Sequence, residues 1–168
     1  MPTDSGGLSE REFNMASPDD EQFQHQMRRY LQADKRIAGR CVWKRKQHPD
    51  YREVVKIVEC SELPEFNGEL RMTAHLSRVP QKFGFVLLLG TQRVLSLDVD
   101  PGRTHFNVKT LVGVSSTHWQ EFPEYEAIED GRDLNHQEWL VEFCKRSNIR
   151  LDILYRTPPH EPPQLILL

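Results

Sequence analysis

Residues 70–77 alternate strictly between apolar and polar side chains, and this pattern constrains the fold more than any other feature of the sequence. The even positions from Leu70 to Leu76 are apolar, and the odd positions from Arg71 to Ser77 are polar. Successive side chains of a β-strand point to opposite faces, so the pattern predicts a strand with one buried and one wet face. Such strands are typical of antiparallel sheets that cover a core on one side only.

Several neighbouring segments have the composition of strands, and a helix is expected before and after them. The predicted strands are 41–46, 53–59, 69–78, 83–89, 92–99, 108–114 and 151–155. Ser17 and Pro18 start a predicted helix over 18–37, and Asn135 with Glu138 forms a predicted capping box for a helix over 135–147. The sequence therefore predicts an α+β fold, with an antiparallel β-sheet of about five to seven strands flanked by an N-terminal and a C-terminal helix.

The chain has 168 residues, which suits one domain of ordinary size. Residues 1–16 are rich in serine, glycine and acidic side chains and are expected to be disordered. A single domain is expected over 17–156. Residues 157–168 include four prolines in TPPHEPP, so an extended tail is expected there.

Charge and cysteine content give no indication of a DNA-binding, disulfide-rich or zinc-ribbon protein, and they leave nucleic-acid binding neither indicated nor excluded. The net charge of −3 gives no large electrostatic footprint for DNA or an anionic membrane. Cys41, Cys60 and Cys144 are odd in number and lack metal-site spacing, so buried, reduced thiols are expected. The apolar run 85–89 is far too short to cross a membrane, and no secretion signal is visible. A cytoplasmic protein without cofactor or metal is expected.

One group of polar residues follows the predicted hairpin. A turn is expected at Pro101-Gly102, and Arg103, His105 and Asn107 then alternate along the chain. A second histidine stands in THW at 117–119. If residues 108–114 fold back beside the preceding strand, the two histidines converge near Asp98 or Asp100.

Two histidines in such a group suit general acid–base chemistry, because imidazole titrates near neutral pH. In this hypothesis His105 and His118 move protons on a ribose hydroxyl and a leaving oxygen, with Asp98 beside them. Arg103 stabilises the phosphorane and Trp119 stacks on a base. The predicted activity is that of a metal-independent ribonuclease.

Three alternatives remain open. His105, His118 and one aspartate could bind a divalent metal, although their spacing is long and irregular. Trp119, Phe122 and Tyr125 could instead form an aromatic anchor for a protein partner, with Arg103 as a rim contact and Asn107 as a further binding residue. In the third alternative the polar residues only satisfy backbone groups near a turn, and the tryptophan is a core residue.

Three stretches of the chain resemble a loose group of uncharacterised small bacterial proteins of mobile-element or toxin–antitoxin-like loci. They are LDVDPGRTHFN at 97–107, THW at 117–119 and VEFCKRSNI at 141–149. Trp119 stands where those proteins carry part of a second histidine-containing pair. The resemblance covers about 60 residues, and it implies a toxin- or defence-like protein but no activity for single residues. Action on RNA is what the acid–base hypothesis predicts.

A second resemblance, to ubiquitin-conjugating enzymes, rests on a helix before a meander of strands, on Pro80, and on the His105-x-Asn107 step. Those enzymes carry a reactive cysteine soon after a His-Pro-Asn motif. Here the next cysteine is Cys144. This resemblance implies a catalytically inactive relative that binds a protein partner.

Overall fold

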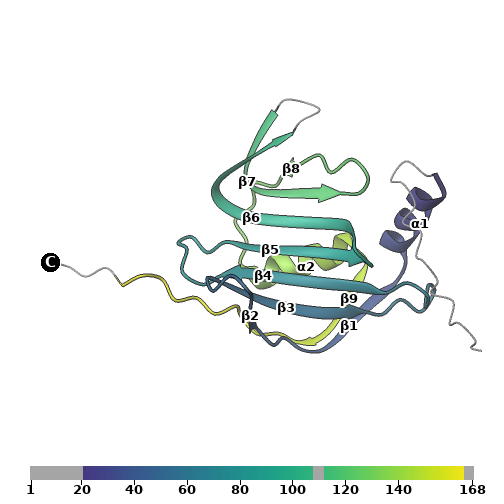
Figure 1. Ribbon diagram of the computed structural model, residues 1–168, viewed down its shortest axis with the longest axis horizontal. Coiled ribbons are helices and arrows are strands. Elements are labelled where there is room, and N and C mark those ends of the chain that lie inside the picture. The colour runs from purple at the N-terminus through teal and green to yellow at the C-terminus, as the bar shows by residue number, and fades with distance from the viewer. Residues whose placement is uncertain (1–20, 108–111, 165–168) are drawn as a thin grey trace, which may run out of the picture.

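Nine strands and two helices make up the part of the chain that the structure describes, and they form an α+β fold (Figure 1). The computed structural model describes the backbone of residues 21–107 and 112–164, and the side chains of residues 21–100 and 117–164. The segment 1–16, predicted to be disordered, lies outside these ranges. The elements are α1 Glu21–Gln32, β1 Lys35–Arg40, β2 Lys44–Arg45, β3 Tyr51–Val58, β4 Gly68–His75, β5 Phe83–Leu89, β6 Gln92–Asn107, β7 Val112–Glu121, β8 Ile128–Glu129, α2 His136–Arg146 and β9 Ile149–Leu154.

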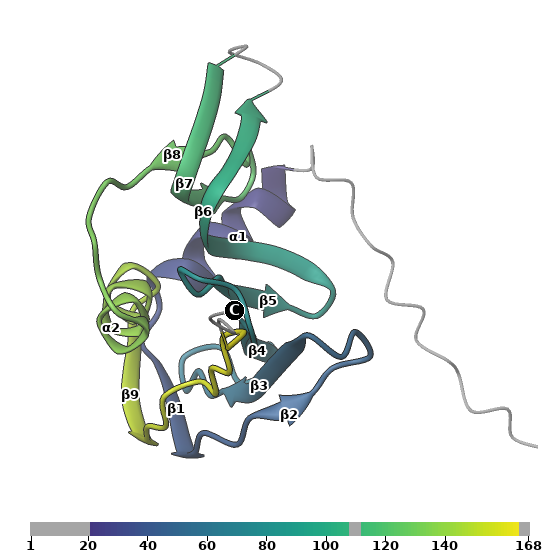
Figure 2. The same ribbon diagram turned by 90° about the vertical axis from the view of Figure 1, so that its left-hand side faces the viewer.

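Seven of the strands form one antiparallel sheet in the order β2-β3-β4-β5-β6-β7-β8, which confirms the predicted fold class. The alternation in β4 is also confirmed, because Leu70, Met72 and Ala74 are fully buried. Their face of the sheet packs against α2 and the β1–β9 pair, and α1 packs near one end of the strands (Figure 2). No described helix covers the opposite face, which is called the uncovered face below.

Helix α2 begins at the predicted capping box. The Asn135 side chain accepts a hydrogen bond from the Glu138 backbone N–H at 2.9 Å, and the Glu138 carboxylate accepts one from the Asn135 backbone N–H at 2.8 Å. These bonds satisfy two of the donors that a helix start leaves unpaired. The apolar stripe of the helix then carries Phe143 onto the sheet, where its ring stacks on Phe85 with centroids 5.7 Å apart.

The predicted extent of the first helix, 18–37, was wrong at its C-terminal end. Helix α1 ends at Gln32, and Lys35 already belongs to strand β1. The buried Lys35 ammonium donates to the carbonyl oxygens of Tyr30, Leu31 and Ala33 at 2.6 to 2.9 Å. A cation there stabilises the negative end of the helix and satisfies its last carbonyls, so the helix ends where this lysine caps it.

Strands β1 and β9 form a separate parallel pair, which the sequence did not predict. Their register aligns Lys35 with Ile149 and Arg40 with Leu154. The predicted strand at 151–155 thus exists, but its partner is the strand directly after α1. Parallel pairing needs a long connection between its strands, and here the whole large sheet and α2 provide it.

The predicted turn at Pro101-Gly102 was wrong, because β6 continues through it to Asn107. The pairing with β7 shifts register between Asp100 and Thr104 instead. Proline and glycine inside a strand are tolerated at such irregularities, where the ladder does not need the missing N–H. The strand predicted at 41–46 is reduced to Lys44–Arg45, and of the strand predicted at 108–114 only the last three residues fall in the described chain, in β7.

Residues 155–164 contain no helix or strand, as the proline content predicted. The remaining tail residues, 165–168, lie outside the described chain. Neither of the described helices is long and apolar enough to cross a membrane.

Candidate functional site

His118 and Asp98 are direct neighbours on the uncovered face. The register of β6 and β7 pairs them, and His118 Nε2 lies 3.6 Å from Asp98 Oδ2. The imidazole is buried, with 7% of its side chain exposed, whereas about half of the Asp98 side chain is exposed. An ion pair forms between them only when the imidazole is protonated. The predicted proximity of these two residues is therefore present in the fold.

Trp119 faces the opposite side of the sheet, as the alternation of a strand requires. Its ring is buried and stacks on Phe143 with centroids 5.9 Å apart. The indole N–H donates to an Asp130 carboxylate oxygen at 3.0 Å, and the Arg146 guanidinium lies 4.7 Å from the ring centroid. Trp119 therefore offers no exposed ring to a base or a partner, and one ligand cannot contact both it and His118.

The side chains of Arg103, His105 and Asn107 lie outside the described residues, so their convergence with His118 stays a prediction. Their backbone belongs to β6, and His105 pairs with Val114. Val114 is four residues from His118 along β7, which corresponds to about 13 Å of strand. The two histidines are thus on adjacent strands but not at adjacent register positions.

Asp100 anchors a loop that the sequence did not single out. Its buried carboxylate lies 2.8 Å from the Arg78 guanidinium and 3.0 Å from the Lys82 ammonium. Burial lowers the pKa of Lys82, but hydrogen bonds to Asp100 and Tyr51 outweigh it and raise the pKa above its ordinary value. The loop between β4 and β5 therefore places the cations of Arg78 and Lys82 beside the Asp100 carboxylate. Asp100 directly precedes the irregular stretch of β6.

His75 shapes the same loop through its acceptor nitrogen. Its Nδ1 accepts hydrogen bonds from the backbone N–H groups of Ser77 and Arg78, both at 3.2 Å. Burial and the nearby cations Arg78 and Lys82 lower the pKa of His75, and Asp50 opposes them. A neutral imidazole suits this role, because a protonated Nδ1 could accept neither bond.

Gly84 makes room for the Asp98 carboxylate. A Cβ atom at Gly84 would lie 3.3 Å from Thr73 Oγ1 and 3.4 Å from Asp98 Oδ1. The Asp98 carboxylate on β6 therefore lies between His118 on β7 and Gly84 on β5. Together these residues form the polar end of the uncovered face, made up of Tyr51, Thr73, His75, Lys82, Gly84, Asp98, Asp100 and His118.

The other end of the uncovered face carries apolar side chains on β3 and β5 with the Glu69–Arg71 ion pair of β4 between them, and it is called the apolar end below. Val55 and Ile57 on β3 are 46% and 75% exposed. Val86 and Leu88 on β5 lie on the same face and are partly exposed. The sequence predicted Val55 and Ile57 as strand residues, but their exposure depends on which face α2 covers.

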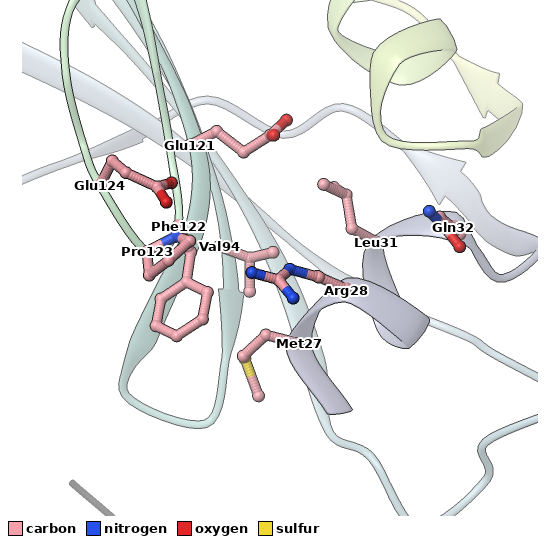
Figure 3. Close-up of a pocket in the computed structure, with 9 residues that line it drawn as sticks. All are labelled: Met27, Arg28, Leu31, Gln32, Val94, Glu121, Phe122, Pro123 and Glu124. Atoms are coloured by element: carbon pink, nitrogen blue, oxygen red, sulfur yellow. The ribbon is translucent and has the colours of Figure 1, made fainter. Parts of the chain in front are cut away.

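Two cavities lie away from this face. One, of about 230 Å³, opens between α1 and the ends of β6 and β7 (Figure 3). Its floor is apolar, with Met27 and Phe122, and its rim carries Arg28, Glu121 and Glu124. The second, of about 470 Å³, lies beside the start of β1 and is lined by polar and charged side chains that largely pair with one another. Neither cavity includes Asp98 or His118 among its lining residues.

Metal binding and thiol chemistry find no support in the described chain. Among the described residues, no group of three histidine, cysteine or carboxylate side chains could hold a metal ion. Cys41, Cys60 and Cys144 are free and buried, and burial raises the pKa of Cys144 to about 12. A thiol with that pKa stays protonated at neutral pH and is a poor nucleophile.

Comparison of the chain with protein-family models, with curated proteins and with solved structures gave no match. The class of protein is therefore defined by its architecture alone. It is an α+β domain whose large antiparallel sheet carries a core on one face and a divided polar and apolar surface on the other.

Proposed function

We propose that this chain is a non-catalytic binding module that contacts a protein partner through the uncovered face of its large sheet. The observation that carries the proposal is the exposure of Val55 and Ile57 on β3, at the apolar end of that face. Apolar side chains that cluster on a surface with polar neighbours are typical of protein contacts. The polar end beside them supplies the hydrogen-bonding groups that such a contact needs for specificity.

Capture experiments with matched variants test this proposal. The chain is immobilised and exposed to an extract of its source cells, alongside the double variant Val55→Lys/Ile57→Lys and the control Leu154→Lys. Leu154 is 63% exposed on β9, away from the uncovered face, so its substitution adds a surface lysine without touching the proposed contact. The wild type and the control should retain the same partner, and the double variant should lose it. Equal retention by all three would rule out this face.

A second candidate function is RNA cleavage by acid–base chemistry, as in a small bacterial toxin- or defence-like protein of the cytoplasm. The pairing of Asp98 with His118 favours it, since a carboxylate beside an imidazole orients the ring and stabilises its protonated form. Arg103 and His105 follow on the same strand. In this proposal His105 is the second group that transfers a proton, Arg103 stabilises the negative charge of the phosphorane, and no metal or cofactor takes part.

Induced expression separates the two functions. A ribonuclease should arrest growth and degrade RNA, and His118→Ala, His105→Ala or Asp98→Asn should each abolish both effects. His160→Ala serves as the control, because His160 lies in the tail, where its ring bonds the Arg78 carbonyl. Intact RNA after expression of the wild type, or undiminished degradation by the His105→Ala/His118→Ala double variant, would eliminate the acid–base hypothesis.

A further inference from the structure

The tail after β9 is fastened to the loop between β4 and β5. The Glu161 backbone N–H donates to the Leu76 carbonyl at 2.7 Å, and the Gln81 side chain donates to the Pro159 carbonyl at 3.0 Å. His160 Nε2 lies 2.7 Å from the Arg78 carbonyl, to which it donates. These three contacts hold the tail at the end of the strands where β4 finishes.

Beyond Glu161 the described chain leads away from the sheet, as the yellow segment at the left of Figure 1 shows. Pro162 and Pro163 are exposed there, and two consecutive prolines keep a chain extended. The next residues in the sequence, 165–168, are Leu-Ile-Leu-Leu. The described chain therefore leads away from the sheet before this apolar stretch of the sequence begins.

The apolar end of the uncovered face is the surface that such a segment would fit. Alternate residues of an extended segment stand about 7 Å apart on one side, and Val55 and Ile57 have the same spacing on β3. The salt bridge between Glu69 and Arg71 flanks them on β4. An extended apolar segment could lie along β3 with two of its leucines against these two side chains.

The direction of the tail decides which molecule's face it meets. Leu76 donates to the Asp50 carbonyl, so Ile57 lies seven residues, or about 23 Å, back along β3 from the point where the tail is fastened. Residues 165–168 could span that distance only if the chain reversed at Pro162 and Pro163. The described residues run the opposite way, so a second copy is the better acceptor.

We propose that two copies of this chain exchange their tails, with residues 165–168 of each packed on Val55 and Ile57 of the other. The inference rests on the proposed function of the uncovered face and names one partner for it. Mutual exchange uses the same contact twice and closes by twofold symmetry, so it produces a dimer.

Sedimentation equilibrium tests the exchange. Protein concentrations of about 10 to 500 µM are needed, because so small an apolar contact gives weak association. The full chain should rise from 19.7 kDa towards twice that mass. A chain shortened after Gln164 and the variant Ile57→Lys should each remain monomeric, and Leu154→Lys should associate like the wild type. A mixture of the shortened chain and Ile57→Lys should associate again, because one supplies the intact face and the other the intact tail.

Three results would overturn the exchange: a monomeric full chain at every concentration, a shortened chain that dimerises like the wild type, or a mixture that stays monomeric. A monomeric full chain that becomes able to bind a free peptide of residues 162–168 only after shortening would place the tail on its own sheet, and would also refute the exchange. The proposed function survives each of these results if Val55→Lys/Ile57→Lys still loses a captured partner.

Discussion

His136 should make the protein sensitive to mild acid. The imidazole is buried at the start of α2 among the rings of Trp43, Phe83, Phe85 and Tyr155. Its Nδ1 lies 2.7 Å from the Tyr155 hydroxyl, and its Nε2 has no hydrogen-bond partner among the described residues. Burial lowers the pKa of His136 from 6.5 to about 3.

The sign and size of the effect follow from this shift. In the unfolded chain the imidazole takes up a proton below about pH 6.5, whereas in the folded chain it stays neutral until about pH 3. Between these values the unfolded state binds more protons, so the free energy of unfolding falls as the pH falls. At pH 5 the free energy of unfolding is lower by about 2 kcal/mol. The size of this loss depends on the pKa of His136 in the unfolded chain, because the imidazole of the folded chain is still neutral at pH 5.

Urea unfolding at pH 7.5 and pH 5.0 measures this loss, with His136→Phe as the variant that cannot titrate. Phenylalanine suits the aromatic surroundings, and any change it causes at pH 7.5 cancels when each protein is compared with itself. The wild type should lose about 2 kcal/mol more than the variant between the two pH values. His25→Gln, at an exposed position, should behave like the wild type. An equal loss in the wild type and His136→Phe would refute the argument.

Two further pairs of substitutions test the packing around the sheet. Gly68→Ala would place a Cβ 1.7 Å from the Tyr30 hydroxyl oxygen, and should lower the free energy of unfolding by about 3 kcal/mol. Gly131→Ala, which meets nothing within 4 Å, should change it by less than about 0.5 kcal/mol in the same urea titration. Asp100→Ala should cost about 2 to 3 kcal/mol, because it leaves the cations of Arg78 and Lys82 without their carboxylate. Ser96→Ala should be neutral or stabilising in thermal unfolding, since the buried Ser96 hydroxyl has no partner among the described residues.

Local patterns predicted the elements whose cause is local. The alternation around Leu70 and the capping box of Asn135 depend on neighbours within four residues, and both are present in the structure. The end of α1 and the β1–β9 pair have distant causes. In the sequence Lys35 is an ordinary polar residue, and only the structure shows that its ammonium binds the carbonyls at the end of α1. Strand β1 forms by pairing with residues more than 100 positions away. No window of the sequence contains that information.

The arrangement of the candidate site likewise has one part with a local cause and one part with a distant cause. His118 and Trp119 face opposite sides of the sheet because they are consecutive residues of β7. The sequence predicted a strand only as far as residue 114, so the hypothesis placed both side chains in one site. That His118 meets Asp98 follows from the register of β6 against β7, which the length of the connection and the irregularity after Asp100 determine together. A shift of one residue would have placed His118 on the core side and Trp119 on the uncovered face. The burial of Trp119 against α2 opposes that shift, so the tryptophan contributes to the site by holding the histidine in register.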